Sequence, residues 1–136
     1  MNNKGFSLPE LLAVVAILGI ISGIAVIAVT KHTADSKKQA YEAMETSIYN
    51  AAENYILENS DKLDELNESG TITIDVDDLI SNNYLEDLDD PNSNETCNSG
   101  SSVTVRKISN SNNSLDEYEY TVNLKCNNFE DEKKFK

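Results

Sequence analysis

The sequence predicts an α+β fold, in which a long N-terminal helix packs on a small antiparallel β-sheet. The helix is predicted because no glycine or proline interrupts residues 24 to 69. The sheet is predicted because the C-terminal half holds short alternating segments separated by stretches rich in Asn, Ser and Gly. With 136 residues, the chain is long enough for one small domain and an anchor.

Charge divides the chain into an apolar head and an acidic body. Lys and Arg number 11 and Asp and Glu number 24, which gives a formal charge of −13, and every acidic residue except Glu10 follows Thr30. Such a body argues against direct nucleic-acid binding, because phosphate contacts need Lys and Arg. We expect the acidity to keep the bodies soluble and mutually repelling.

The apolar head predicts a membrane-spanning helix. From Leu11 to Val29 no side chain is charged and Ser22 is the only polar one. At about 1.5 Å per residue the run is roughly 28 Å long, close to the roughly 30 Å hydrocarbon core of a bilayer. A secretory signal peptide would need a cleavage site of small residues after the run. Ala28-Val29-Thr30 does not supply one, so the run is expected to be retained.

Glu10 is the anomaly of this region, because a carboxylate at the edge of an apolar span is costly and is a functional candidate by default. It belongs to the string Gly5-Phe6-Ser7-Leu8-Pro9-Glu10-Leu11-Leu12, which follows Lys4. This string resembles the processing motif of type IV prepilins and type II secretion pseudopilins. Leader, Gly, Phe, Glu and apolar run all occur in the order that the family has.

The resemblance implies that a prepilin peptidase cuts between Gly5 and Phe6, that Phe6 becomes the N-methylated terminus, and that Glu10 is the family's assembly glutamate. It also implies a pilin-like fold. The implied partners are identical or related pilin subunits, the assembly platform with its ATPase, and the lipid bilayer. The implied location is the cytoplasmic (inner) membrane as a single-pass precursor, followed by a cell-surface filament. Counting positive charges around the span favours the opposite orientation.

The residues themselves suggest why cleavage matters. Cutting after Gly5 creates an amine at Phe6, one helical turn from Glu10. Amine and carboxylate can pair in low dielectric, within one chain or between neighbours, where pairing sets the axial register. The alternative is that Glu10 sits solvated among lipid headgroups.

Gly19 and Gly23 form a G-x-x-x-G pair inside the apolar run. Small residues at this spacing let membrane helices approach closely. Glycine also weakens a helix by about 1 kcal/mol relative to Ala, so the pair is also a candidate place for unwinding. Ordinary membrane-helix composition is the third interpretation.

Past the membrane run the sequence keeps a helical period to about Asn59. The apolar positions are Ala40, Tyr41, Met44, Ile48, Ala52, Tyr55 and Ile56, and Glu42, Glu45, Asn50, Glu53 and Glu58 are placed largely off that face. One helix is predicted from Phe6 to Asn59, with Leu63 and Leu66 in a last turn or a separate helix ended by Gly70. The expected divisions are a leader (1–5), a membrane or filament-core helix (6–30), its amphipathic continuation (31–66) and a globular head (67–136).

The head is expected to hold strands at Thr71–Val76, Val103–Ile108 and Leu115–Leu124, and a helix at Asp77–Leu85. A hairpin around Ser109–Ser114 that sets Val105 opposite Tyr118 also sets Cys97 opposite Cys126. We therefore predict a Cys97–Cys126 disulfide, with two free buried thiols as the alternative. The tail, Asn127–Lys136, is expected to be loose.

No catalytic constellation is found, so no enzyme is expected. His32 is the only histidine, two cysteines alone cannot form a zinc site, and there is no phosphate-binding glycine loop. The acidic clusters at Asp75/Asp77/Asp78 and Glu86/Asp87/Asp89/Asp90 fail the EF-hand pattern. They are interpreted as solvated surface, so no cofactor is expected. Calcium is kept as an alternative, because some pseudopilins bind it in a comparable loop.

Three functions follow from these features. The first is a pilin of a type IV pilus, for adhesion, twitching motility or biofilm. The second is a pseudopilin of a type II secretion or competence (DNA-uptake) apparatus. The third is a membrane-anchored binding domain that does not polymerise.

Overall fold

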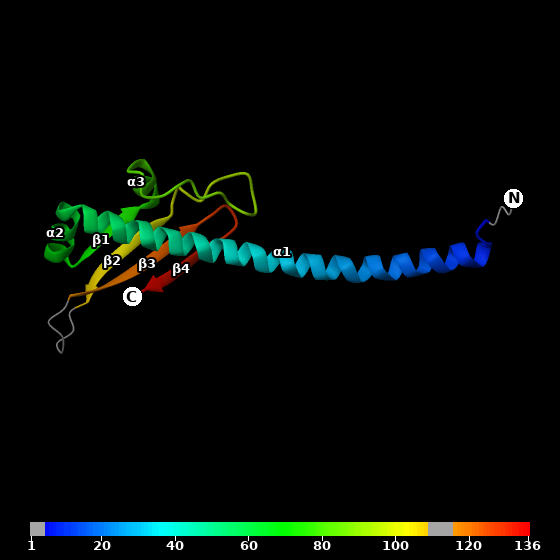
Figure 1. Ribbon diagram of the computed structural model, residues 1–136. Coiled ribbons are helices and arrows are strands. Elements are labelled where there is room, and N and C mark those ends of the chain that lie inside the picture. The colour runs from blue at the N-terminus through cyan, green and yellow to red at the C-terminus, as the bar shows by residue number, and fades with distance from the viewer. Residues whose placement is uncertain (1–4, 109–115) are drawn as a thin grey trace. The chain divides into compact units, whose positions relative to one another are not determined.

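The computed structural model describes residues 5–108 and 116–136, except for the side chains of residues 23–32. The chain divides into two compact units, Met1–Lys38 and Gln39–Lys136. The elements are α1 (Leu8–Glu58), α2 (Ser60–Ser69), β1 (Thr71–Asp75), α3 (Val76–Ser81), β2 (Ser102–Ile108), β3 (Glu117–Lys125) and β4 (Glu130–Phe135), as labelled in Figure 1.

Helix α1 begins at Leu8, not at the predicted Phe6, because Ser7 caps it. The Ser7 carbonyl accepts the Leu11 N–H at 3.1 Å, and the Ser7 N–H donates to Oε2 of Glu10 at 3.1 Å. This second bond is the glutamate half of a capping box, which satisfies an N–H group that the helix leaves unpaired. The predicted single helix is confirmed, and it ends at Glu58.

The apolar run Leu11–Val29 extends into residues 23–32, whose side chains lie outside the description. From Leu11 to Ser22 its side chains are exposed. Among the residues that the structure describes, no helix is long and apolar enough to cross a membrane.

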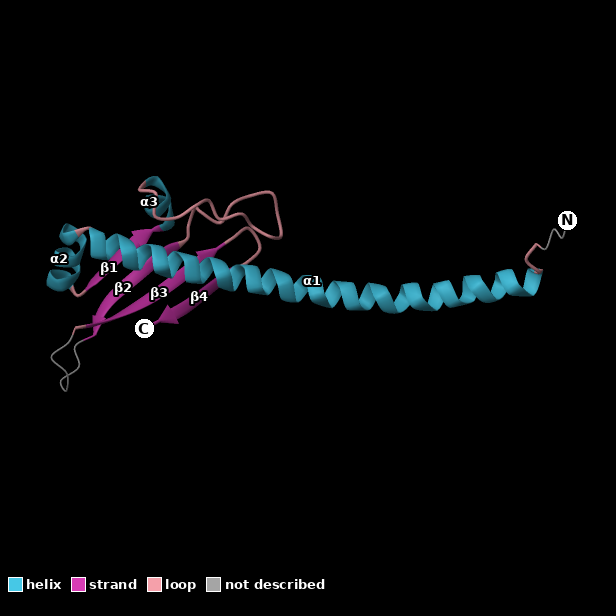
Figure 2. Cartoon of the chain, viewed as in Figure 1, coloured by secondary structure: helices cyan, strands magenta, loops and turns pink. Residues whose placement is uncertain are grey.

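The second unit is built on an antiparallel sheet in which each described strand pairs with the next along the chain, in the order β1-β2-β3-β4. The C-terminal part of α1 crosses one face of this sheet (Figure 2). The predicted α+β class, with a helix on a small antiparallel sheet, is therefore confirmed.

The core lies between this face of the sheet and α1. The strands supply alternating buried residues, namely Ile72, Ile74, Val103, Val105, Tyr120, Val122 and Leu124. The helix supplies Tyr41, Ile48, Ala51, Ala52 and Ile56, which confirms the predicted apolar stripe. The opposite face of the sheet is polar, and Thr73 and Thr104 lie side by side on it with their hydroxyl oxygens 3.4 Å apart.

The placement of Glu45 off the apolar face is wrong, because its side chain is only 1% exposed. Glu45 lies one helical turn after Tyr41 and one turn before Ile48, so helical geometry puts it on the buried stripe. Its charge suggested the solvent side, but its position in the helix decides.

The helical segments after α1 are short and well delimited. Of the two alternatives for Leu63 and Leu66, the separate helix is correct. Asn59 has an extended backbone, which separates α1 from α2. Gly70 ends α2 as predicted, with a left-handed φ of 79° and its N–H bonded to the Leu66 carbonyl. Helix α3 ends at Ser81 instead of Leu85, because Asn82 is its C-cap and Asn83 takes a positive φ of 62°.

The predicted pairing of Val105 with Tyr118 is wrong. Val105 lies opposite Tyr120, and Val103 lies opposite Val122. The predicted register is shifted by an even number of residues, so the predicted buried faces of the strands are correct. The turn predicted at residues 109–114 lies outside the described residues.

The prediction of a loose tail is wrong for most of its length, because Glu130–Phe135 forms strand β4 on the edge of the sheet. Its sequence, Glu-Asp-Glu-Lys-Lys-Phe, is almost wholly charged and gives no alternating apolar signal. Charged residues are a common feature of edge strands, because they discourage pairing with other chains.

Candidate functional site

The predicted cleavage site precedes α1. Gly5 and Phe6 lie outside the helix, and the Phe6 side chain is 86% exposed. A Cβ placed on Gly5 would meet nothing within 4 Å. The peptide bond between the two residues is therefore not held in regular structure.

The carboxylate of Glu10 is engaged within its own helix end. It is exposed and accepts the Ser7 N–H. The predicted partner, a charged Phe6 nitrogen, is a peptide nitrogen while residues 1–5 are attached. In the uncut chain Glu10 thus satisfies a helix-cap donor instead of pairing with a cation.

The start of α1 presents apolar side chains without partners among the described residues. Those exposed by half or more are Leu8, Leu11, Leu12, Val15, Ile17, Leu18, Ile20 and Ile21. Gly19 lies in this stretch, and a Cβ added there would meet nothing within 4 Å. The surroundings of Gly23, its predicted companion, lie outside the description. An exposed apolar surface of this kind marks a site of contact with another protein or with a membrane.

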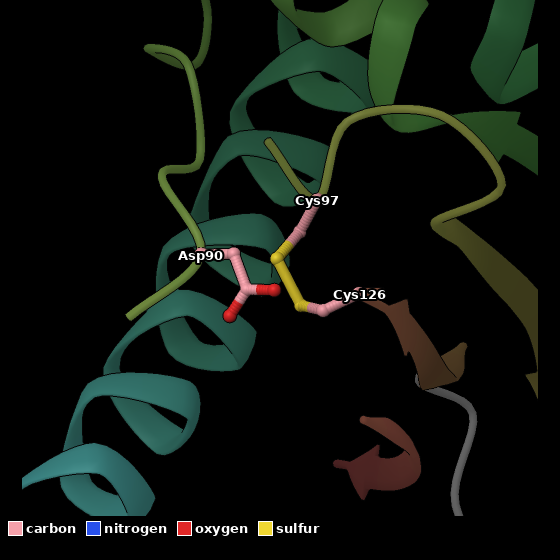
Figure 3. Close-up of side chains that lie close together, drawn as sticks. All are labelled: Asp90, Cys97 and Cys126. Carbon is pink, nitrogen blue, oxygen red and sulfur yellow. A yellow bond between two sulfur atoms is a disulfide. The ribbon is translucent and has the colours of Figure 1, made fainter. Parts of the chain in front are cut away.

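A second cluster of chemically active residues lies in the head. Cys97 and Cys126 form a disulfide with an S–S distance of 2.03 Å and a Cα–Cα distance of 4.5 Å, and Asp90 lies beside it (Figure 3). The bridge therefore has the predicted partners. It does not arise from strand register, since Cys97 lies in the loop before β2, where its N–H donates to the Leu88 carbonyl.

Asp90 and the two cysteines place their ligand atoms within 4.8 Å of one another, the distance range of a metal site. Both sulfur atoms are consumed by the disulfide, so neither can be the thiolate that a metal needs. In the described part of the chain this is the one such group, and the acidic clusters considered for calcium form none.

Asp90 is instead a buried hydrogen-bond acceptor. Its carboxylate accepts the Asn92 N–H at 2.9 Å, the Tyr41 hydroxyl at 2.8 Å and the Ser93 hydroxyl at 3.0 Å. These bonds, led by that from the Asn92 backbone, hold the pKa of Asp90 below its usual value despite its burial. Sequence reasoning missed this role, although Asp-Pro-Asn-Ser is a turn sequence in which an Asp side chain commonly binds the backbone.

Tyr41 connects this loop to α1 and to the turn before β4. Its ring stacks on Phe129, with centroids 3.8 Å apart, and its oxygen accepts the Asn92 amide at 2.6 Å. Burial, and next the hydrogen bond to Asp90, raise the pKa of Tyr41. The Phe129 carbonyl accepts the Cys126 N–H at 2.7 Å. Helix, loop and turn are thus joined around the disulfide.

Comparison with known families gives one match, at the N-terminus. Residues 1–26 match the family model described as the prokaryotic N-terminal methylation motif, which is the signature of type IV pilins and pseudopilins. No curated protein and no solved structure matches the chain. The chain therefore carries the type IV pilin and pseudopilin signature on a pilin-like α+β fold. This motif belongs to structural proteins rather than to enzymes.

Proposed function

We propose that the protein is the pilin subunit of a type IV pilus, assembled through its N-terminal helix into an extracellular filament for adhesion, motility or biofilm. The observation that carries the proposal is the methylation motif, matched over residues 1–26, within which the start of α1 exposes an apolar surface. A subunit whose helix start has no cover of its own is suited to a bundle of like helices.

The proposed pathway begins in the membrane. The precursor is held in the cytoplasmic membrane by residues 6–30, and a prepilin peptidase removes residues 1–5. The bond after Gly5 suits this step because it lies before α1 in an exposed segment. Methylation of Phe6 and transfer by the assembly platform and its ATPase follow. Lipid covers the apolar surface before assembly, and neighbouring subunits cover it afterwards.

Glu10 is proposed to change partner during this pathway. Its present partner, the Ser7 N–H, is a neutral donor at 3.1 Å. The amine released at Phe6 is a cation, so its bond to the carboxylate adds the attraction of two opposite charges, which the Ser7 N–H does not supply. The amine of an adjacent subunit can therefore compete for the carboxylate and fix the axial position of the incoming chain.

The same motif is compatible with a pseudopilin of a secretion or competence apparatus, and with an anchored domain that stays single. Cleavage and shearing separate these functions. N-terminal sequencing and mass spectrometry of material sheared from cells should find chains that begin at N-methylated Phe6. Long filaments in the electron microscope support the pilin, and cleavage without long filaments supports the pseudopilin.

The decisive variant is Glu10→Gln, which keeps the shape of the side chain and removes its charge. We expect processing at Gly5 to continue and the amount of sheared filament to fall at least about tenfold, as expected for the loss of about 1.4 kcal/mol or more per subunit contact. Asp35→Asn is the matched control, because it removes an exposed acid from the same helix. Filaments of E10Q at the control level, or mature chains that begin at Met1, would contradict the proposal.

A further inference from the structure

Glu45 is a buried carboxylate whose charge has no adequate partner. Its side chain is 1% exposed, and neither oxygen of the ionised carboxylate accepts a hydrogen bond from a described residue. The nearest cation, Nζ of Lys133, is 3.9 Å from Oε2. That distance is too long for a direct hydrogen bond. Lys133 is itself well exposed, so it neutralises Glu45 only weakly.

The residues that face Glu45 from β4 are mostly charged. Asp131, Lys133 and Phe135 alternate with outward residues along β4 and lie opposite Leu124, Val122 and Tyr120 of the core. Lys133 attracts the Glu45 charge, and Asp131 together with Glu42 on α1 repels it. Further along, Tyr49 of α1 stacks on Phe135, with centroids 4.6 Å apart.

Ionised Glu45 is therefore unfavourable while β4 covers it. Burial is the largest cause that raises its pKa, to about 7, and Asp131 adds to the rise both as an acceptor for its proton and by its charge. In its neutral form Glu45 has a proton to donate to Asp131. In its charged form it faces a second carboxylate across the interface between helix and strand.

Strand β4 is also the element of the sheet best placed to move. It is an edge strand, which among the described strands pairs with β3 alone, and most of its side chains are exposed. Elements with one neighbour and many exposed groups open at lower free energy than core strands. A repulsive charge beneath such a strand acts first on that strand.

We propose that β4 is a pH-sensitive latch, seated on α1 while Glu45 is neutral and loosened when Glu45 loses its proton to solvent. Loosening uncovers Tyr49 and the backbone groups of β3 from Tyr120 to Lys125 that β4 now occupies. That edge is then available to another strand. The inference does not depend on the filament function, since every group involved lies in one head.

Amide hydrogen exchange of the full chain in detergent micelles, read by NMR, tests the latch. Protection of the β4 amides, after division by the intrinsic exchange rate, should fall on the order of a hundredfold between about pH 5 and pH 9. The β2–β3 pairing around Val103 and Val122 should hold its protection and serves as the internal reference. The ¹³C resonance of the Glu45 carboxyl should titrate near neutrality.

Glu45→Gln should abolish the pH dependence, because the amide keeps the shape and cannot ionise. Asp131→Asn should move the transition to lower pH. Glu132→Gln is the matched control, since it removes a carboxylate from the exposed, outward side of β4 and should leave the transition in place. Titration of Glu45 at the value of an exposed glutamate, or equal pH dependence in E45Q and the native chain, would overturn the inference.

Discussion

Tyr41 and Asp90 show how single polar groups hold the head together. The tyrosine hydroxyl donates to Asp90 and accepts from Asn92, while its ring stacks on Phe129. The side chains of Tyr41 and Asp90 are buried, and Phe129 is partly buried. Removing one partner of such a bond costs more free energy than forming the bond gains, because the other partner is left buried and unsatisfied.

Tyr41→Phe should therefore destabilise the head by about 1–3 kcal/mol. The ring and its stacking on Phe129 are retained, so the loss reports the hydroxyl alone. Urea unfolding followed by circular dichroism measures it. Tyr84→Phe is the comparison, because Tyr84 is only partly buried and its hydroxyl bond to Glu58 is exposed. Equal midpoints for Y41F and the native chain would show that the buried bond adds nothing.

Asp90 gives the head an acid-sensitive stability. Its pKa is lowered from 3.8 in the folded chain, so its stabilisation is present above that value and is lost as the pH falls through the folded pKa. Asp90→Asn should lower stability at neutral pH and flatten the decline below about pH 4. Denaturant midpoints measured at a series of pH values give both effects. An unchanged acid decline in D90N would assign the decline to other carboxylates.

For Glu45 the pH dependence of folding stability has the opposite sign. Its folded pKa of about 7 lies above the ordinary value of 4.5, so the folded chain binds the extra proton. Stability should fall as the pH rises from about 4.5 to about 7 and stay constant above, by roughly 3 kcal/mol at most. Glu45→Gln should remove this fall, again read from denaturant midpoints. The two carboxylates together predict maximal stability in mildly acidic solution.

Among the elements, the loop of residues 82–101 has no regular structure of its own and depends on the disulfide. Cys97 and Cys126 are separated by 29 residues, so in the chain-entropy model their bridge contributes about 3–4 kcal/mol. The double variant Cys97→Ser/Cys126→Ser should lose about that much in thermal unfolding. Reductant should destabilise the native chain and leave the variant unchanged. A native chain indifferent to reductant would contradict this role.

The strands that could be predicted were those with alternating apolar residues. In β1, β2 and β3 the period of two marks the buried face, and the face survives even though the pairing of Val105 is shifted. Strand β4 could not be found in this way, because its pairing comes from the backbone and its side chains are charged. The alternation of apolar residues shows which side of a strand is buried. A polar edge strand has no such alternation, and it forms because its backbone pairs with the neighbouring strand.

The candidate sites divide in the same manner. The N-terminal residues Gly5, Phe6 and Glu10 were found because a processing enzyme reads a linear string. Asp90 and Glu45 were missed because their roles depend on residues distant in the chain, such as Tyr41 for Asp90 and Asp131 for Glu45. From sequence alone a carboxylate is expected to be solvated, and its burial is known only from the residues that the fold packs around it.

At the scale of the whole molecule, the two units have separate physical tasks. All buried core residues, from Tyr41 to Cys126, lie within Gln39–Lys136. The exposed apolar residues before Gly23 lie in Met1–Lys38. The residues that form the core and the residues that expose apolar surface therefore lie in different stretches of the chain.

A fragment of residues 39–136 should then fold alone and stay monomeric. It keeps the core, the disulfide and nearly all the acidic residues, so its copies should repel one another in solution. Light scattering should give the monomer mass, and circular dichroism should show a cooperative transition that shifts to lower temperature with reductant. The full chain, which retains the apolar helix surface, should require detergent or self-associate under the same conditions. If the fragment associated as strongly as the full chain, the head itself would carry the contacts, and assembly would no longer depend on the exposed start of α1.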